Sequence, residues 1–131
     1  MNFIVEGQFV GKQRPRFSNG HVYTPQKTKD YEKLVQQEYI RNYGERKIKE
    51  PIFVGIIAYF EPPKSWSKKK KQQAYGGILS PVVKPDIDNI AKTILDALNG
   101  LAYEDDKQVV RCEIVKRYGI RPRVAITIKY D

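Results

Sequence analysis

The ten residues PIFVGIIAYF, at positions 51–60, form an almost uninterrupted apolar run within a chain that is otherwise rich in charge. The run is dominated by β-branched and aromatic side chains, which favour strands. A strand that lacks alternating polar residues is usually buried on both of its faces. The run therefore predicts a central strand at the heart of a sheet that is covered on both sides.

The segments around this run show the periodicity of strands and helices. Residues 3–10 alternate like a half-buried strand, and residues 107–118 and 123–130 alternate cleanly enough to predict an antiparallel hairpin. Helical spacing extends from about Pro25 to Gly44 and again over 88–99. These patterns predict a single α+β domain over residues 1–131, with a mixed sheet of about four main strands and two principal helices.

The composition of the chain points to a polyanionic partner. The 131 residues carry 24 Lys and Arg against 15 Asp and Glu, for a formal net charge of +9. The single Cys112 and single His21 exclude a zinc site of cysteines and histidines, and a lone cysteine fits a reducing compartment. No apolar run is long enough to span a membrane. We therefore expect a soluble cytoplasmic protein without a membrane partner.

Two segments concentrate the positive charge. Residues 11–24 are rich in cations and turn formers and predict an exposed basic hairpin or loop. Residues 61–83 begin with paired prolines, carry a run of lysines and predict a basic insertion with about one helical turn. Each lysine taken alone is equally well explained by solubility. Together, the two segments predict a surface that contacts backbone phosphates and loses affinity steeply with salt.

In contrast to these basic segments, the motif KPDIDN at 84–89 places two carboxylates two residues apart. Asp86 and Asp88 point the same way if the chain arrives extended and the helix begins only at about Asp88. Helix capping by either acid is the commoner explanation for an isolated motif of this kind. The chemical alternative is a pair of metal ligands at a strand-to-helix junction.

Further charged residues favour the chemical alternative. Lys92 follows Asp88 by one helical turn and is placed to neutralise charge on a bound phosphate. Residues 104–106 crowd three acids into a turn that is either solvated or bridged by a cation. Whether Asp106 returns to Asp86 and Asp88 depends on the strand order, which the spacing leaves open. A convergence of carboxylates would suit a hard cation such as Mg²⁺.

The stretch KPDIDNIAKTILDALNGLAYEDDKQVV, at 84–110, resembles the signature of the RusA family of Holliday junction resolvases, in the branch found in Gram-positive bacteria and phages. The segments GKQRPRF, VYTPQKT and SWSKKKK resemble the same branch, so the resemblance extends over most of the chain. The loop after the 88–99 helix is about one residue shorter than in the best-known member, and Pro85 stands where that member has arginine.

The resemblance implies an activity and a set of site residues. It implies catalytic roles for Asp86, Asp88, Lys92 and Asp106, with the three acids holding Mg²⁺, for which Mn²⁺ can substitute, and with no nucleotide cofactor. It leaves the role of Asp105 open. The implied enzyme is a homodimer with two-fold symmetry, located in the cytoplasm with the nucleoid. It acts in DNA recombination and repair, for a host chromosome or a prophage.

The implied reaction is the resolution of four-way DNA junctions by paired symmetric nicks that leave 5′-phosphate and 3′-hydroxyl ends. Two alternatives stay open: a non-catalytic basic DNA-binding module, and a nuclease for other branched DNA. Lys12, His21 and nearby aromatic side chains are further candidates for DNA contact. The residues predicted to contact DNA are Arg14, Arg16, Lys27, Lys68, Lys69 and Lys70.

Overall fold

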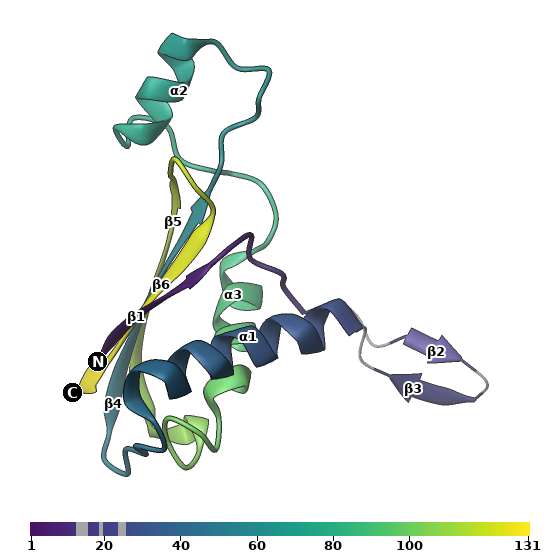
Figure 1. Cartoon of the computed structure of the whole chain (residues 1–131), viewed down its shortest axis with the longest axis vertical. Coiled ribbons are helices and arrows are strands. Elements are labelled where there is room, and N and C mark those ends of the chain that lie inside the picture. The colour runs from purple at the N-terminus through teal and green to yellow at the C-terminus, as the bar shows by residue number, and fades with distance from the viewer. Residues whose placement is uncertain (13–15, 19, 24–25) are drawn as a thin grey trace.

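The computed structural model describes residues 1–12, 16–18, 20–23 and 26–131. A four-stranded sheet is flanked by helices, and a two-stranded hairpin projects beyond one end of the first helix (Figure 1). The elements are, in chain order, β1 (Asn2–Glu6), β2 (Arg16–Ser18), β3 (His21–Tyr23), α1 (Gln26–Tyr43), β4 (Ile52–Phe60), α2 (Lys68–Tyr75), α3 (Ile87–Leu98), the 3-10 helix η1 (Asp106–Gln108), β5 (Val109–Tyr118) and β6 (Arg123–Tyr130). The predicted α+β class and mixed sheet are confirmed.

The strand order of the sheet is β1-β6-β4-β5, so the apolar run does form an inner strand. The predicted hairpin of β5 and β6 is wrong, because β4 lies between them. β5 runs parallel to β4, and β6 runs antiparallel to it. Two successive parallel strands need a crossover connection, which here carries α3. Clean alternation identified both strands correctly but contained no information about their partners.

The core lies between the sheet and the two long helices, α1 and α3, which cover the same face (Figure 1). Every second residue of β4 is buried toward them, from Ile52 to Ala58. The helices face the sheet with an apolar stripe, which includes Tyr31, Val35 and Tyr39 of α1 and Ile90, Ile94 and Leu98 of α3. The predicted apolar face of the 88–99 helix is thus confirmed. Gly100 follows its end with a φ of +78°, the left-handed conformation that ends helices.

On the opposite face of the sheet, only the end of α2, among the described residues, lies beside the strands, with Ala74 and Tyr75 lining a pocket next to Ile57 and Tyr59, so the prediction that β4 is covered along both faces is wrong (Figure 1). Phe53, Ile57 and Tyr59 point to this open face and are only partly buried. Long cationic side chains from the neighbouring strands lie over the aromatic rings instead. The Arg123 guanidinium carbon is 3.8 Å from the centre of the Tyr59 ring, and Arg111 and Lys129 lie 4.9 and 5.0 Å from that of Phe53.

The two basic segments take the forms expected of them, with one difference. Strands β2 and β3 pair as the predicted hairpin, in which Ser18 pairs with His21. The insertion at 61–83 contains a helix of eight residues, α2, rather than a single turn. Ser67 begins it, since its side-chain oxygen accepts a hydrogen bond from the Lys70 N–H at 3.2 Å. Among the helices described, none has the length and apolar character needed to cross a membrane.

Candidate active site and nucleic-acid interface

The paired acids lie where the chain enters α3. Asp86 is the N-cap residue, with an extended backbone, and Asp88 lies in the first turn. The Asp86 side chain makes no capping hydrogen bond, although its position is the one at which Asp usually makes one. Both residues are exposed. The capping explanation therefore does not account for Asp86, and its carboxylate is available to a ligand.

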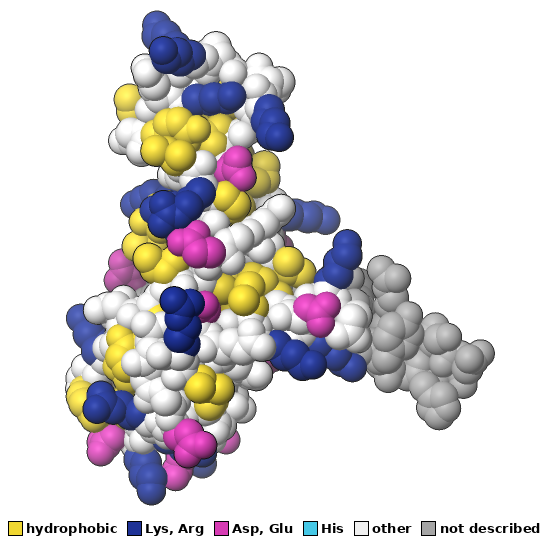
Figure 2. All heavy atoms as spheres, viewed as in Figure 1, with side chains coloured by type: hydrophobic (Ala, Val, Ile, Leu, Met, Phe, Trp, Pro, Cys, Tyr) yellow, Lys and Arg dark blue, Asp and Glu magenta, His cyan; other side chains and the backbone are white. Residues whose placement is uncertain are grey.

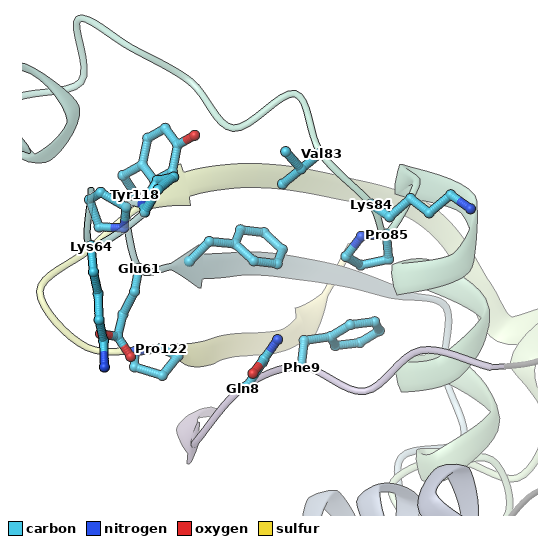
Figure 3. A pocket seen from close by; sticks show the side chains of 12 residues that line it. Gln8, Phe9, Glu61, Lys64, Val83, Lys84, Pro85, Tyr118 and Pro122 are labelled. Atoms are coloured by element: carbon cyan, nitrogen blue, oxygen red, sulfur yellow. The ribbon is translucent and has the colours of Figure 1, made fainter. Parts of the chain in front are cut away.

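A shallow groove of about 600 Å³ runs beside Asp86. Its other wall is the segment that follows β1, and the ammonium-bearing residues Lys27 and Lys84 also line it. A second hollow of about 390 Å³ adjoins it at Pro85 and continues toward Tyr118 and Lys64 (Figure 3). A carboxylate flanked by lysines in an open groove can bind a cation and a phosphate side by side.

The two acids of the 105–106 turn have different roles. The Asp105 carboxylate accepts a hydrogen bond from the Lys107 N–H at 2.9 Å, and the Gln108 side chain accepts one from the Asp105 N–H at 3.0 Å. This reciprocal arrangement is a capping box. The Lys107 N–H lowers the pKa of Asp105 below its ordinary value. Asp105 is thus a structural cap, whereas Asp106 is exposed in the first turn of η1.

Asp106 does not lie with Asp86 and Asp88. Pro85 shares a hollow with Phe60 and Tyr118, at the C-terminal ends of β4 and β5. Asp106 precedes Val109, which pairs with Ile52 at the other end of the same strands. The intervening α3 has 12 residues and spans about 18 Å. Within the described part of one chain, no three acidic, histidine or cysteine side chains come together as a metal site.

The strand order explains this separation. Because β4 and β5 are parallel, the crossover helix must run back along the full length of the strands before β5 begins. The acids before α3 and after it are therefore held at opposite ends of the sheet. The convergence that the sequence left open does not occur within one chain.

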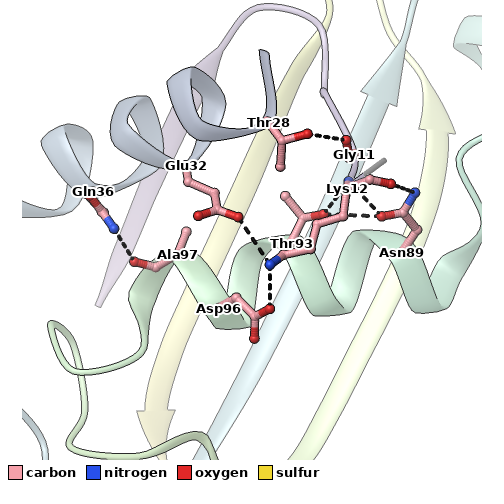
Figure 4. A network of polar contacts seen from close by, with 9 residues as sticks. All are labelled: Gly11, Lys12, Thr28, Glu32, Gln36, Asn89, Thr93, Asp96 and Ala97. Atoms are coloured by element: carbon pink, nitrogen blue, oxygen red, sulfur yellow. Dashed lines mark hydrogen bonds and ion pairs between the residues drawn. The ribbon is translucent and has the colours of Figure 1, made fainter. Parts of the chain in front are cut away.

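Two lysines of the predicted interface differ in their availability. Lys92 is exposed one turn after Asp88, and no ion pair joins it to Asp88 or Asp96 among the described residues. Lys12 is instead held inside the fold, because its Nζ lies 2.8 Å from Asp96 and 3.4 Å from Glu32 (Figure 4). Desolvation opposes its charge, but the hydrogen bond and charges of the two acids raise the pKa of Lys12. Lys12 thus anchors its segment to α1 and α3, and its charge is paired with the two acids.

Asn89, the last residue of the KPDIDN motif, has a role that the sequence did not reveal. Its Oδ1 accepts a hydrogen bond from the Lys12 N–H at 2.9 Å, and its Nδ2 donates one to the Lys12 carbonyl at 3.3 Å (Figure 4). The hydroxyl of the buried Thr93 donates to the same Oδ1 at 3.2 Å. Gly11 belongs to this clamp, since a Cβ there would lie 2.6 Å from Asn89 Nδ2. The clamp fixes the wall of the groove against the start of α3.

We expect Asn89→Ala to lower the free energy of unfolding by about 1–3 kcal/mol, because it removes the side-chain donor to the Lys12 carbonyl and one of the two side-chain acceptors of the Lys12 N–H. Urea denaturation followed by circular dichroism measures the change. The matched control is Asn99→Ala, at the exposed C-terminal cap of the same helix, for which we expect a change within about 0.5 kcal/mol. Equal losses in the two variants would contradict the clamp.

The cations predicted to contact DNA fall into two groups. Lys68, Lys69 and Lys70 are exposed on α2, where Lys and Arg side chains surround the top of the molecule (Figure 2). Positive charges at a helix N-terminus oppose the helix dipole, so this run is not explained by helix stability. Trp66 packs against Tyr118 with ring centres 5.4 Å apart, and Lys70 Nζ lies 4.1 Å from the centre of the Trp66 ring.

The second group lies on the hairpin and at the start of α1. Lys27 is exposed and lines the groove beside Asp86. Arg16 belongs to β2, but its side chain, like that of His21, lies outside the described part of the structure, as does the whole of Arg14. The described cations thus form one group on α2 and another around Lys27 and Lys84, which line the groove beside Asp86.

Comparison with known proteins assigns almost the whole chain to one protein family. The family model described as "Endodeoxyribonuclease RusA" matches residues 6–129. The chain belongs to the RusA endodeoxyribonuclease family. Among curated proteins, it is 40% identical over 135 residues to "Uncharacterized protein YqaN" of Bacillus subtilis (strain 168), covering 98% of this chain and 95% of that protein. The RusA match spans the clamp, both acidic segments and both basic segments described above.

Proposed function

We propose that this protein is a metal-dependent, structure-selective endodeoxyribonuclease that resolves four-way DNA junctions. The observation that carries the proposal is the carboxylate of Asp86, uncapped at the start of α3 in a groove lined by lysines. Membership of the RusA family supports a nuclease, and the basic surface of α2 supports a DNA substrate. The resolution of junctions, the metal and the roles of the residues are parts of this proposal.

The residues of the groove fit a hard divalent cation. Asp86 and Asp88 offer carboxylate oxygens, the ligands that Mg²⁺ prefers, and Mn²⁺ accepts the same donors. Within one chain, the third predicted ligand, Asp106, lies beyond the other end of α3, and the described residues include no group of three acids that could hold a metal ion. A two-fold homodimer in which α3 of one protomer lies antiparallel to that of its partner would bring the partner's Asp106 to them.

The chain's own residues then have defined tasks in hydrolysis. A bound cation supplies a Lewis acid for the phosphate and lowers the pKa of the attacking water. The water oxygen bonds to phosphorus, the bond from phosphorus to the 3′ oxygen breaks, and a proton passes to that oxygen. The ends are a 5′-phosphate and a 3′-hydroxyl. Lys92, one turn beyond Asp88, offers an ammonium group that neutralises charge developing on the phosphate.

The basic surfaces serve binding. Lys68, Lys69 and Lys70 on α2 and Lys27 beside the groove would contact backbone phosphates, which positions a duplex without reading its sequence. Arg14 and Arg16 on the hairpin segment are proposed to do the same. A homodimer carries two copies of each surface, related by the same two-fold axis as the strands of a junction. The selectivity for branched DNA would then arise from the shape of the dimer.

Two other functions make different predictions. A non-catalytic DNA-binding module explains the basic surfaces but leaves the uncapped Asp86 near phosphates, which repel it unless a cation intervenes. A nuclease for flaps or replication forks would use every residue named here. The comparison of substrates therefore decides between the second alternative and a resolvase.

The deciding experiment incubates the purified protein with Mg²⁺ and a mobile four-way junction, with a flap, a fork and a linear duplex in parallel. We expect paired symmetric nicks in the junction alone, lost on addition of EDTA, and binding that falls about 10³-fold or more between 50 and 200 mM salt. Faster cleavage of the flap or fork would replace the resolvase with the other nuclease. Tight binding without a cut in Mg²⁺ or Mn²⁺ would leave only the binding module.

A further inference from the structure

The hollow that adjoins the groove at Pro85 has an apolar lining that the proposed hydrolysis does not use. Its volume of about 390 Å³ lies within the range of about 300–1,000 Å³ that is typical of small-ligand pockets. Most of its lining side chains are aromatic or proline, namely Phe9, Phe60, Pro62, Pro63, Pro85, Tyr118 and Pro122. Backbone phosphates gain nothing from such surfaces. Flat heterocyclic rings do, because they stack on aromatic side chains.

Contacts within the chain hold the walls of the hollow in place. Phe9 is buried in the core. Tyr118 packs edge-on against Trp66, with ring centres 5.4 Å apart. The Lys116 ammonium donates a hydrogen bond to the Val83 carbonyl, which fixes the segment before α3 to β5. A ligand therefore meets a pre-formed pocket, so little ordering of the protein opposes its binding.

Two polar side chains lie at one side of the hollow. Gln8 and Glu61 lie on either side of Pro122 (Figure 3). Glu61 is exposed, and within the described residues no ion pair joins it to a cation, although Lys64 lines the same hollow. A free carboxylate repels phosphates, so phosphate binding does not explain its presence. Carboxylate and amide groups are, however, the side-chain groups that hydrogen-bond to the edges of nucleobases.

The hollow is continuous with the groove beside Asp86. Both are lined by Gln8, Phe9, Lys84 and Pro85. Pro85 directly precedes Asp86, the N-cap residue of α3. A DNA strand whose phosphate lies at Asp86 therefore brings the base of an adjoining nucleotide to the hollow.

We propose that the hollow takes one unstacked nucleobase next to the phosphate in the groove, with aromatic and proline side chains against its faces and Glu61 and Gln8 at its edge. This pocket rests on the proposed function, because the DNA in the groove is the substrate of that enzyme. Extruding a base costs least where stacking is already interrupted, as at the crossover of a four-way junction. The pocket therefore favours binding with the crossover at the groove.

The chemistry of Glu61 predicts which bases the hollow favours. Its carboxylate only accepts hydrogen bonds, whereas the amide of Gln8 both donates and accepts them. Adenine, cytosine and guanine carry an exocyclic amino group that can donate to the carboxylate. Thymine carries an oxygen in place of the cytosine amino group, and the carboxylate repels that oxygen. The hollow should therefore favour the three amino-bearing bases over thymine.

Weakening one base pair at a time locates the base that enters the hollow. In an immobile four-way junction, an abasic nucleotide is placed in turn opposite each base around the crossover, and affinity is measured in Ca²⁺. Extrusion costs less once the pairing partner is gone, so we expect binding to tighten by about ten-fold at one position in each of two opposite strands. A gain spread evenly over all positions, or no gain, would show that the hollow takes no base and would overturn the proposal.

Filling the hollow should remove that gain. Val83 lines the hollow and is 54% exposed, so Val83→Trp places an indole there without disturbing the core. We expect this variant to bind the junction about ten-fold more weakly and to lose the gain at the selected position. The matched control is Val82→Trp, at the neighbouring residue, which is 93% exposed and lies outside the lining. It should keep the native affinity within about two-fold. Equal losses in the two variants would contradict the pocket.

The identity of the base at the selected position tests Glu61. With the abasic nucleotide kept opposite, the native protein should prefer the amino-bearing bases over thymine by about five-fold or more. Glu61→Gln should reduce this preference to within about two-fold, because an amide also donates to the thymine oxygen. Glu45→Gln, the same change at an exposed acid in the turn after α1, should keep the native preference. A preference that Glu61→Gln leaves unchanged would remove Glu61 from the base edge.

These measurements need binding and no cleavage, so they are separable from those for the enzyme. A protein that cuts no DNA but shows the selected position would retain the pocket and reject the nuclease. Paired nicks in a junction without a selected position would reject the pocket and leave the proposed function intact.

Discussion

Replacing Asp88 with Asn is expected to lower the rate of junction cleavage by about 10³-fold or more, with little change in junction affinity. The substitution keeps the shape of the side chain and removes the charge that would hold the cation at the start of α3. Asp88 is exposed and lies apart from the core, so the fold should be retained. Single-turnover cleavage in Mg²⁺, together with a binding assay in Ca²⁺, measures the two effects separately.

The chain offers a matched control for this variant. Asp105→Asn is the same change of acid to amide, in the acidic segment that carries Asp106. The Asp105 oxygen accepts a hydrogen bond from the Lys107 N–H, a task that an amide oxygen also performs. We expect cleavage by this control within about three-fold of the native rate. A loss as large as that of Asp88→Asn would instead make Asp105 a ligand, and full activity of Asp88→Asn would remove Asp88 from the site.

Mixing two inactive variants should restore cleavage if the acids of one site come from two chains. Asp88→Asn and Asp106→Asn are each expected to be inactive alone, by about 10³-fold. In a heterodimer, one site receives both substitutions and the other receives none. At equal amounts and with random exchange, about a quarter of the native sites are regenerated. The product should be single nicks rather than paired ones, because each active dimer has one working site.

The variants are mixed in urea at a concentration that allows subunit exchange, refolded together and assayed on a junction labelled on all four strands. Mixing after refolding, without exchange, is the control and should stay inactive. If the three acids belonged to one chain, every chain in the mixture would be defective and no activity would return. That outcome would mean that all three proposed ligands come from a single protomer. Asp106 would then have to reach Asp86 and Asp88, at the other end of α3, without a partner chain.

Sequence patterns were sufficient for most of the fold. The apolar run at 51–60 became the inner strand β4, and the stripe from Ile90 to Leu98 became the buried face of α3. These predictions succeeded because periodicity records which side chains are buried. The predicted pairing of β5 with β6 was wrong because periodicity does not record which strand lies alongside. Both strands would show the same alternation beside any neighbour. The open face of β4 was also missed, because cations stacked on aromatic rings occur there in place of a second layer.

The candidate site shows the same division between local and long-range information. That Asp86 and Asp88 open a helix follows from the motif itself, and the structure agrees. The place of Asp106 depended on the crossover between parallel strands, which no local pattern encodes. Lys12 looked like a cation for DNA, but Asp96 and Glu32, distant in sequence, neutralise it. Asn89 stood within the quoted motif, but its partner lies 77 residues away.

The span of α3 has a consequence for how such a nuclease is regulated. If Asp86, Asp88 and Asp106 are the metal ligands, as we propose, one protomer cannot complete the set by itself, because α3 holds two of the acids at one end and the third at the other. At concentrations below the dimer dissociation constant, the rate of nicking should therefore scale with the square of the protein concentration. Under the proposed function, a newly made chain would cut no DNA until it met a second chain. The length of one helix would thus set a threshold of expression below which DNA is not cut.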